Sequence, residues 1–187
     1  MSDRSFRRAR AAILLALAAA LLAVAAPSLL WAYHLDRAGA LLERGLAWPQ
    51  PRLADALPTV RDPRALDEAR AHLAQAQRWR PDHPHAYRLA GHAALARGDW
   101  PAAVRALEAA RARAPRHPLI AWETGLAYEQ FWRAAPADSA AHTHMVASWR
   151  AAGLTGAALR ARGDEALALG HDPQPWYARA AALQDTP

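Results

Sequence analysis

The chain has 187 residues, which is room for one domain, or for one domain and an anchor. Apolar residues make up 53 % of it, which excludes a disordered tail, and it has no Cys, which excludes disulfides and Cys-bound zinc. The net charge is +6, and all 23 basic residues are arginine, because Lys is absent. Asn is absent as well, and the loss of both residues is typical of a GC-rich bacterial coding bias. β-branched residues never alternate along the chain, so the predicted fold class is all-α.

The first predicted element is a transmembrane signal-anchor helix over 11–33, a span that contains no charged residue. At about 1.5 Å per residue, it is long enough to cross a hydrocarbon core of roughly 30 Å. Residues 1–10 carry four arginines and are predicted to stay in the cytoplasm, while Trp31 and Tyr33 lie at the far end, where aromatic rings favour the interface. The sequence therefore predicts a single-pass protein of the cell membrane whose remaining residues are extracytoplasmic.

Two alternatives to this signal anchor stay open. Ala23-Val24-Ala25 has the small-x-small form of a signal-peptidase site, although Pro27 follows it and the apolar run continues. The other alternative is a buried helix of a soluble domain, although so long an apolar run is unusual in a small domain.

Residues 34–63 are predicted to form a juxtamembrane helix and a Pro-rich linker. The amphipathic stretch 35–47 either continues the membrane helix outward or serves as the partner of the next helix. Four prolines between Trp48 and Pro63 are too many for one continuous helix, so this part is predicted to be extended.

A repeated spacing organises residues 64–187. Pro-Asp-His-Pro at 81–84 and Pro-Arg-His-Pro at 115–118 stand 34 residues apart in the same register. Internal periodicity of this length, with small residues where two helices approach closely, resembles the tetratricopeptide repeat family. The resemblance implies a short α-solenoid of about three to four helix pairs over 64–187, clearest in the middle repeat at 84–117 and degenerate at both ends.

The resemblance depends on small and aromatic residues at the positions where paired helices pack. In the middle repeat, Gly91 and Ala103 are predicted to face each other across a close helix pair, with Gly98-Asp99 in the turn. The predicted repeat-defining packing residues are Ala69, Leu73, Ala76, Tyr87, Ala90, Gly91, Ala103, Leu107, Ala110, Gly125, Tyr128 and Gly163.

The family resemblance also implies a concave groove, lined by the first helix of each pair, whose exposed positions select a partner. Trp122 is the most interesting of these positions, although it fits equally well as a residue packed under the next helix. Arg88 matches one position of the clamp that chaperone-binding members use, but His92 stands where that clamp needs Asn, so an acidic chaperone tail is not expected. The candidate groove residues are His85, Arg88, His92, Trp122, Leu126 and Glu129.

Catalytic and metal-binding patterns are weak in this sequence. Its nine histidines form no His-Glu-x-x-His pair and are expected in loops and on the surface, with a weak transition-metal site as the alternative. Glu123 and the adjacent acids Asp67-Glu68 and Asp164-Glu165 are interpreted as residues on solvated helix faces or in the first turn of a helix, where the helix dipole favours acids. The sequence therefore predicts neither an enzyme nor a cofactor.

The predicted function is a membrane-tethered protein–protein interaction scaffold, an accessory or assembly subunit of a larger membrane complex. Its predicted partners are other proteins, chiefly membrane-embedded subunits, and the lipid bilayer through 11–33, with no nucleic acid. The alternative is an extracytoplasmic binding module for a diffusible peptide or secreted protein, which an enclosed polar pocket would favour.

Overall fold

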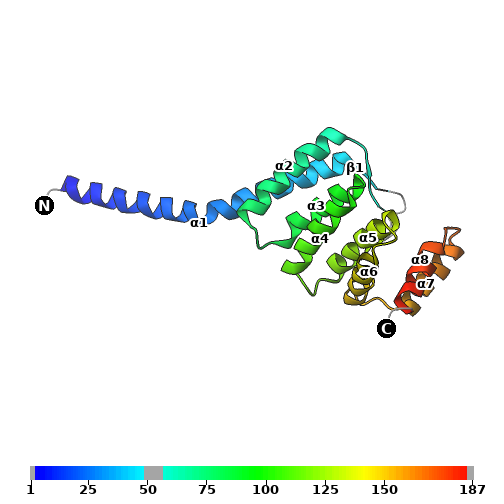
Figure 1. Cartoon of the computed structure of the whole chain (residues 1–187). Helices are drawn as coiled ribbons and strands as arrows, with labels where there is room; N and C mark the ends of the chain where they lie inside the picture. Colours follow the sequence, from blue (N-terminus) through cyan, green and yellow to red (C-terminus); the bar gives the residue numbers. More distant parts are fainter. Residues whose placement is uncertain (1–2, 49–56, 185–187) are drawn as a thin grey trace.

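The structure is a computed structural model that describes residues 3–48 and 57–184. Within these residues it contains eight helices and a short pair of antiparallel strands, and the N-terminal part of helix α1 projects away from an array of packed helices (Figure 1). The all-α prediction is therefore confirmed, with the strand pair as an addition. The elements are α1 (Asp3–Gly45), β1 (Leu46–Ala47), β2 (Thr59–Val60), α2 (Pro63–Trp79), α3 (Pro84–Ala96), α4 (Trp100–Arg113), α5 (Pro118–Ala134), α6 (Ser139–Ala151), α7 (Gly156–Ala168) and α8 (Gln174–Gln184).

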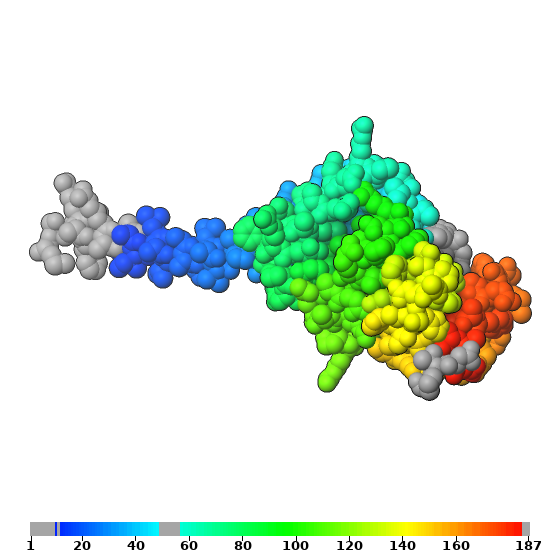
Figure 2. Space-filling view, viewed as in Figure 1, coloured from blue at the N-terminus to red at the C-terminus, as the bar shows by residue number. Residues whose placement is uncertain are grey.

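Helix α1 is a single helix of 43 residues that continues through Pro27. From Ala12 onward it is long and apolar enough to cross a membrane. The side chains of residues 12–25 are all exposed, with Leu15 and Leu21 each 71 % exposed, and Figure 2 shows this stretch extending alone from the molecule. So large an exposed apolar surface needs a nonaqueous environment or a partner to cover it.

The last part of α1 belongs to the array. Ala38, Leu41 and Leu42 are buried against α2, so the stretch 35–47, predicted either to continue the N-terminal helix or to pair with the next one, is continuous with the rest of α1 and also packs against α2. After α1 ends, β1 pairs with β2, and the chain returns to the start of α2 through the Pro-rich segment. The part of that segment at 49–56 lies outside the described residues.

The 34-residue spacing corresponds to a repeated way of starting a helix. His83 and His117 are the N-cap residues of α3 and α5, and each is followed by a proline at the first helical position. Proline is tolerated there because its missing N–H would have no helical partner. The turn before α4 contains Gly98 at φ +68°, a left-handed conformation that favours glycine.

Within three of the helix pairs, a glycine of the first helix lies against a large side chain of the second. A Cβ atom on Gly91 of α3 would lie 2.6 Å from Leu107 of α4, closer than carbon atoms pack. The structure therefore places Leu107, and not the predicted Ala103, opposite Gly91. The same arrangement pairs Gly125 of α5 with Trp149 of α6, and Gly163 of α7 with Tyr177 of α8.

Most of the predicted packing residues are buried in the array. Tyr87 and Ala90 are half-buried, and the guanidinium of Arg113 lies 3.9 Å from the centre of the Tyr87 ring. The buried members are Ala69, Leu73, Ala76, Gly91, Ala103, Leu107, Ala110, Gly125, Tyr128 and Gly163.

Candidate functional site: a groove beside the long helix

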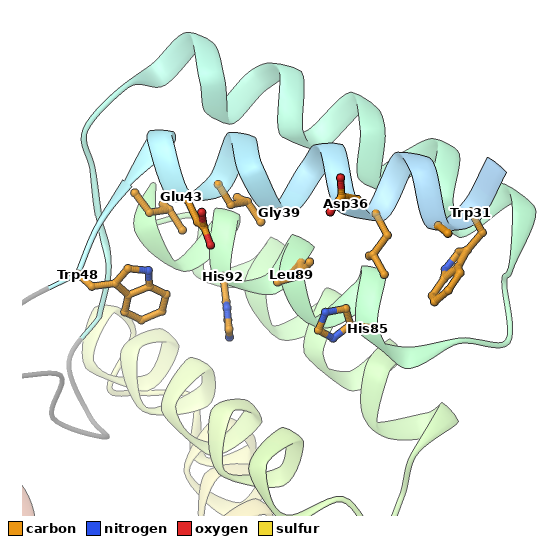
Figure 3. A pocket seen from close by; sticks show the side chains of 12 residues that line it. Trp31, Asp36, Gly39, Glu43, Trp48, His85, Leu89 and His92 are labelled. Atoms are coloured by element: carbon orange, nitrogen blue, oxygen red, sulfur yellow. The ribbon is translucent and has the colours of Figure 1, made fainter. Parts of the chain in front are cut away.

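A groove of about 480 Å³ lies between the last part of α1 and helix α3 (Figure 3). Leu35 and Leu42 of α1 and Leu89 of α3 supply its apolar lining. Trp31 and Trp48 lie at its two ends, so the groove follows the part of α1 that leaves the exposed apolar segment. A concave, mostly apolar surface with a few polar groups is the usual form of a binding site.

The α1 wall of the groove carries two exposed carboxylates, on Asp36 and Glu43, with Gly39 between them (Figure 3). The two acids are seven residues apart, and that spacing puts both on the same face of a helix. Neither carboxylate forms an ion pair with another residue in the described part of the chain. A Cβ on Gly39 would meet nothing within 4 Å, so this wall has open space at its centre.

The opposite wall, on α3, presents His85 and His92, again seven residues apart (Figure 3). His92 is 9 % exposed, and the ring of Trp48 meets it edge-on, with the ring centres 5.7 Å apart. Burial, reinforced by the nearby charge of Arg88, lowers the pKa of His85, so this side chain is neutral at pH 7. The prediction of surface histidines is wrong for His92, which is a buried member of an ion-pair network.

Glu123 of α5 anchors that network behind the α3 wall. Nε and Nη2 of Arg88 donate hydrogen bonds of 2.7 and 2.6 Å to its two carboxylate oxygens, and Nε2 of His92 lies 3.0 Å from one of them. Burial alone would raise the pKa of Glu123, but the hydrogen bonds from His92 and Arg88 outweigh it and hold the pKa below its usual value. The prediction of a solvated Glu123 is therefore wrong, and Arg88 is already committed to this ion pair.

The other three predicted groove residues lie in a second, closed cluster. Trp122 stacks on Trp176 of α8, with the ring centres 6.1 Å apart and the ring planes at 3°. Nε of Arg179 on α8 donates a hydrogen bond of 3.0 Å to Oε2 of Glu129, Nη2 lies 2.9 Å from the same oxygen, and both side chains are 4 % exposed. The prediction of an exposed groove over α5 is wrong, because Trp122, Leu126 and Glu129 are all buried, Trp122 and Glu129 against α8.

Residues 62–121, which span α2 to the start of α5, match the family model described as a tetratricopeptide repeat. This segment belongs to the tetratricopeptide repeat family. The helix pairs on either side of it extend the same antiparallel stacking into a solenoid. No curated protein matches the chain.

The match indicates a protein-interaction module, and stacked repeats of this kind use extended concave surfaces for binding. In this array the last part of α1 takes the place of a first helix, since it pairs with α2 as α3 pairs with α4. The groove between α1 and α3 is therefore bounded by two consecutive first helices. The sequence indicated the α3 side of this groove through His85 and His92, but not its α1 side.

Four histidines outside the groove lie at contacts between helices. His34 of α1 and His72 of α2 approach each other with their Nδ1 atoms 2.9 Å apart. His142 and His144 lie against the rings of Trp132 and Tyr128 on α5. In the part of the chain that the structure describes, no three His, Asp or Glu side chains are grouped so that they could hold a metal ion.

Proposed function

We propose that this protein is a membrane-tethered interaction scaffold, an accessory or assembly subunit of a larger membrane complex. The observation that carries the proposal is the continuity of α1, whose first part is exposed and apolar and whose last part is a helix of the tetratricopeptide array. An anchor joined to the array in this way would fix the orientation of the groove as well as its location.

The length and flanks of the helix support this placement. The exposed apolar part precedes Trp31 and Tyr33, two aromatic residues suited to a membrane interface. The arginines in 1–10 favour a cytoplasmic N-terminus, which would put the array on the extracytoplasmic side. Confinement beside a membrane raises the effective concentration of a partner in the same membrane, without any added contact.

Topology gives the first test. A periplasm-active reporter fused after Pro187 should be active, and the protein should remain in the membrane fraction after a carbonate wash. A cytoplasmic reporter signal would overturn the orientation, and release by carbonate would indicate a cleaved signal or a soluble helix instead.

The rigid connection gives a sharper test, with alanines inserted after the exposed Leu29. Two inserted residues turn the groove by about 200° and move it by about 3 Å, whereas four turn it by about 40° and move it by about 6 Å. If one partner contacts both the exposed part of α1 and the groove, that partner, isolated with the full-length protein from native membranes, should be lost with two alanines and largely kept with four. Equal recovery with both insertions would reduce α1 to a passive tether.

The form of the groove favours this function over capture of a diffusible peptide or secreted protein. An enclosed polar pocket would suit the diffusible ligand, whereas this groove is open and has an apolar lining that begins beside the exposed segment of α1. A partner recovered from the soluble fraction as readily as from membranes would reverse this preference.

A further inference from the structure

The groove between α1 and α3 also carries information about the chemistry of its occupant. We infer that it binds an amphipathic α-helix of a partner protein that presents two basic side chains seven residues apart. This inference rests on the proposed function only in assuming that the partner is a protein. Its evidence is the spacing of the two free carboxylates, the open space at Gly39 and the charge balance of the walls.

The spacing of the two acids favours a helix over an extended peptide as the occupant. Asp36 and Glu43 are about 10.5 Å apart along α1, since each helical residue advances about 1.5 Å. On a docked helix, side chains seven residues apart match this distance and lie on the same face. An extended peptide covers about 10 Å in three residues, and side chains three apart on a strand point to opposite sides. A docked helix therefore matches the spacing of the two acids more closely than a peptide strand does.

Space for a helix exists at the centre of the groove. The axes of packed helices lie about 8–10 Å apart, and small residues at the contact permit the shorter distances. Gly39 provides such a position, since nothing lies within 4 Å of the Cβ direction, and Leu89 of α3 faces it across the groove (Figure 3). The volume of about 480 Å³ admits the apolar side chains along one face of a helix, and the rest of the helix remains outside.

The charge of the groove is opposite to that of the chain. The whole protein has a net charge of +6, yet the α1 wall carries two carboxylates without an ion-pair partner among the described residues. On the α3 wall, Arg88 is neutralised by Glu123 and His85 is neutral at pH 7. A second copy of this chain is a poor occupant, because a symmetric contact through this wall would bring its carboxylates against those of the first copy.

Binding of designed peptides to the full-length protein in phosphatidylcholine nanodiscs, followed by fluorescence anisotropy, tests the inference. The probe is a 14-residue helix with a leucine face and two arginines seven residues apart. The matched probe has glutamates in place of the arginines, and empty nanodiscs measure binding to lipid. We expect the arginine peptide to bind at least tenfold more tightly than the glutamate peptide. Equal affinities would overturn the inference.

Protein variants then assign the contact to the groove. Gly39→Leu fills the open centre, and the double variant Asp36→Arg with Glu43→Arg reverses the charge of the wall, so each should weaken binding at least tenfold. Two controls should bind normally: Ala40→Leu, on an exposed position beside the groove, and Glu165→Arg, on the exposed surface of α7. Full binding by Gly39→Leu would overturn the inference.

The experiments distinguish failure of the membrane scaffold from failure of the groove as its binding site. If Gly39→Leu stays in carbonate-washed membranes and still recovers its native partner, the scaffold stands and the partner does not use this groove. If the unaltered protein is released by carbonate, the membrane scaffold fails, whatever the peptides show.

Discussion

Replacing Gly125 with alanine tests the close packing between the helices of a pair. A Cβ at this position would lie 2.2 Å from Cδ1 and Nε1 of Trp149, a rigid ring that is 1 % exposed and also packs against Trp122. Overpacking of this kind typically costs about 1–3 kcal/mol, and so short a contact with a rigid ring belongs at the upper end. The better helix propensity of alanine returns about 1 kcal/mol, which leaves a net loss of about 2 kcal/mol.

For a chain of this length, that loss lowers the melting temperature by about 4–8 °C. The measurement is thermal unfolding of the full-length protein in detergent, followed by circular dichroism. Gly39→Ala is the matched control, because the same substitution in an open helical site should stabilise by about 0.5–1 kcal/mol. A melting temperature of Gly125→Ala at or above that of the unaltered protein would refute the assignment of this contact.

Three further predictions concern the buried charged groups and the histidines. Glu129→Ala leaves the Arg179 guanidinium buried without its carboxylate and should destabilise the folded protein by about 3–5 kcal/mol. The double variant Glu129→Leu with Arg179→Met should restore most of the melting temperature, and its failure to do so would contradict this account. Because the pKa of Glu123 is lowered, its ionised form stabilises the fold above the unfolded value of 4.5, and urea titrations should show this contribution disappearing at lower pH. Glu123→Gln should remove that pH dependence, and an unchanged profile would count against the network. Burial, and then the charge of His34, lower the pKa of His72, so stability should fall as the pH drops below 6.5, and His72→Gln should flatten this step.

Much of the array could be predicted because its local signals agree with one another. The repeated His-Pro pair is both a spacing and a helix start, so period and capping indicate the same boundaries at α3 and α5. Small residues then marked the helix contacts. The prediction that Gly91 faces Ala103 was wrong, because a periodic pattern identifies the buried face of each helix but not which side chain fills the space opposite a glycine.

The groove was harder to predict, because charge and burial depend on contacts between distant segments. Arg88 and Glu123 stand about one repeat apart, so opposite charges at the repeat spacing were an available signal for that ion pair. No comparable signal existed for the contact between Arg179 of α8 and Glu129 of α5, because the last helix pair departs from the repeat spacing. Asp36, Gly39 and Glu43 were missed because 34–63 was predicted to be a juxtamembrane helix and a Pro-rich linker, and the groove was sought only within the repeat domain at 64–187.

The role of α1 makes the first helix pair depend on the long helix. The apolar face of α2 that contains Leu66 and Leu73 packs against the last part of α1, so a chain that begins at residue 64 lacks the other half of this core. Cleavage after Ala25 would remove only the exposed apolar part, because the contacts with the array begin near Trp31, whose ring lies 4.6 Å from that of His83. We therefore expect fragment 26–187 to keep the melting temperature of the full-length protein, and fragment 64–187 to melt markedly lower. Equal melting temperatures for the two fragments would show that the array folds as stably without α1. The α1 wall, with Asp36 and Glu43, would then not be a fixed part of the groove.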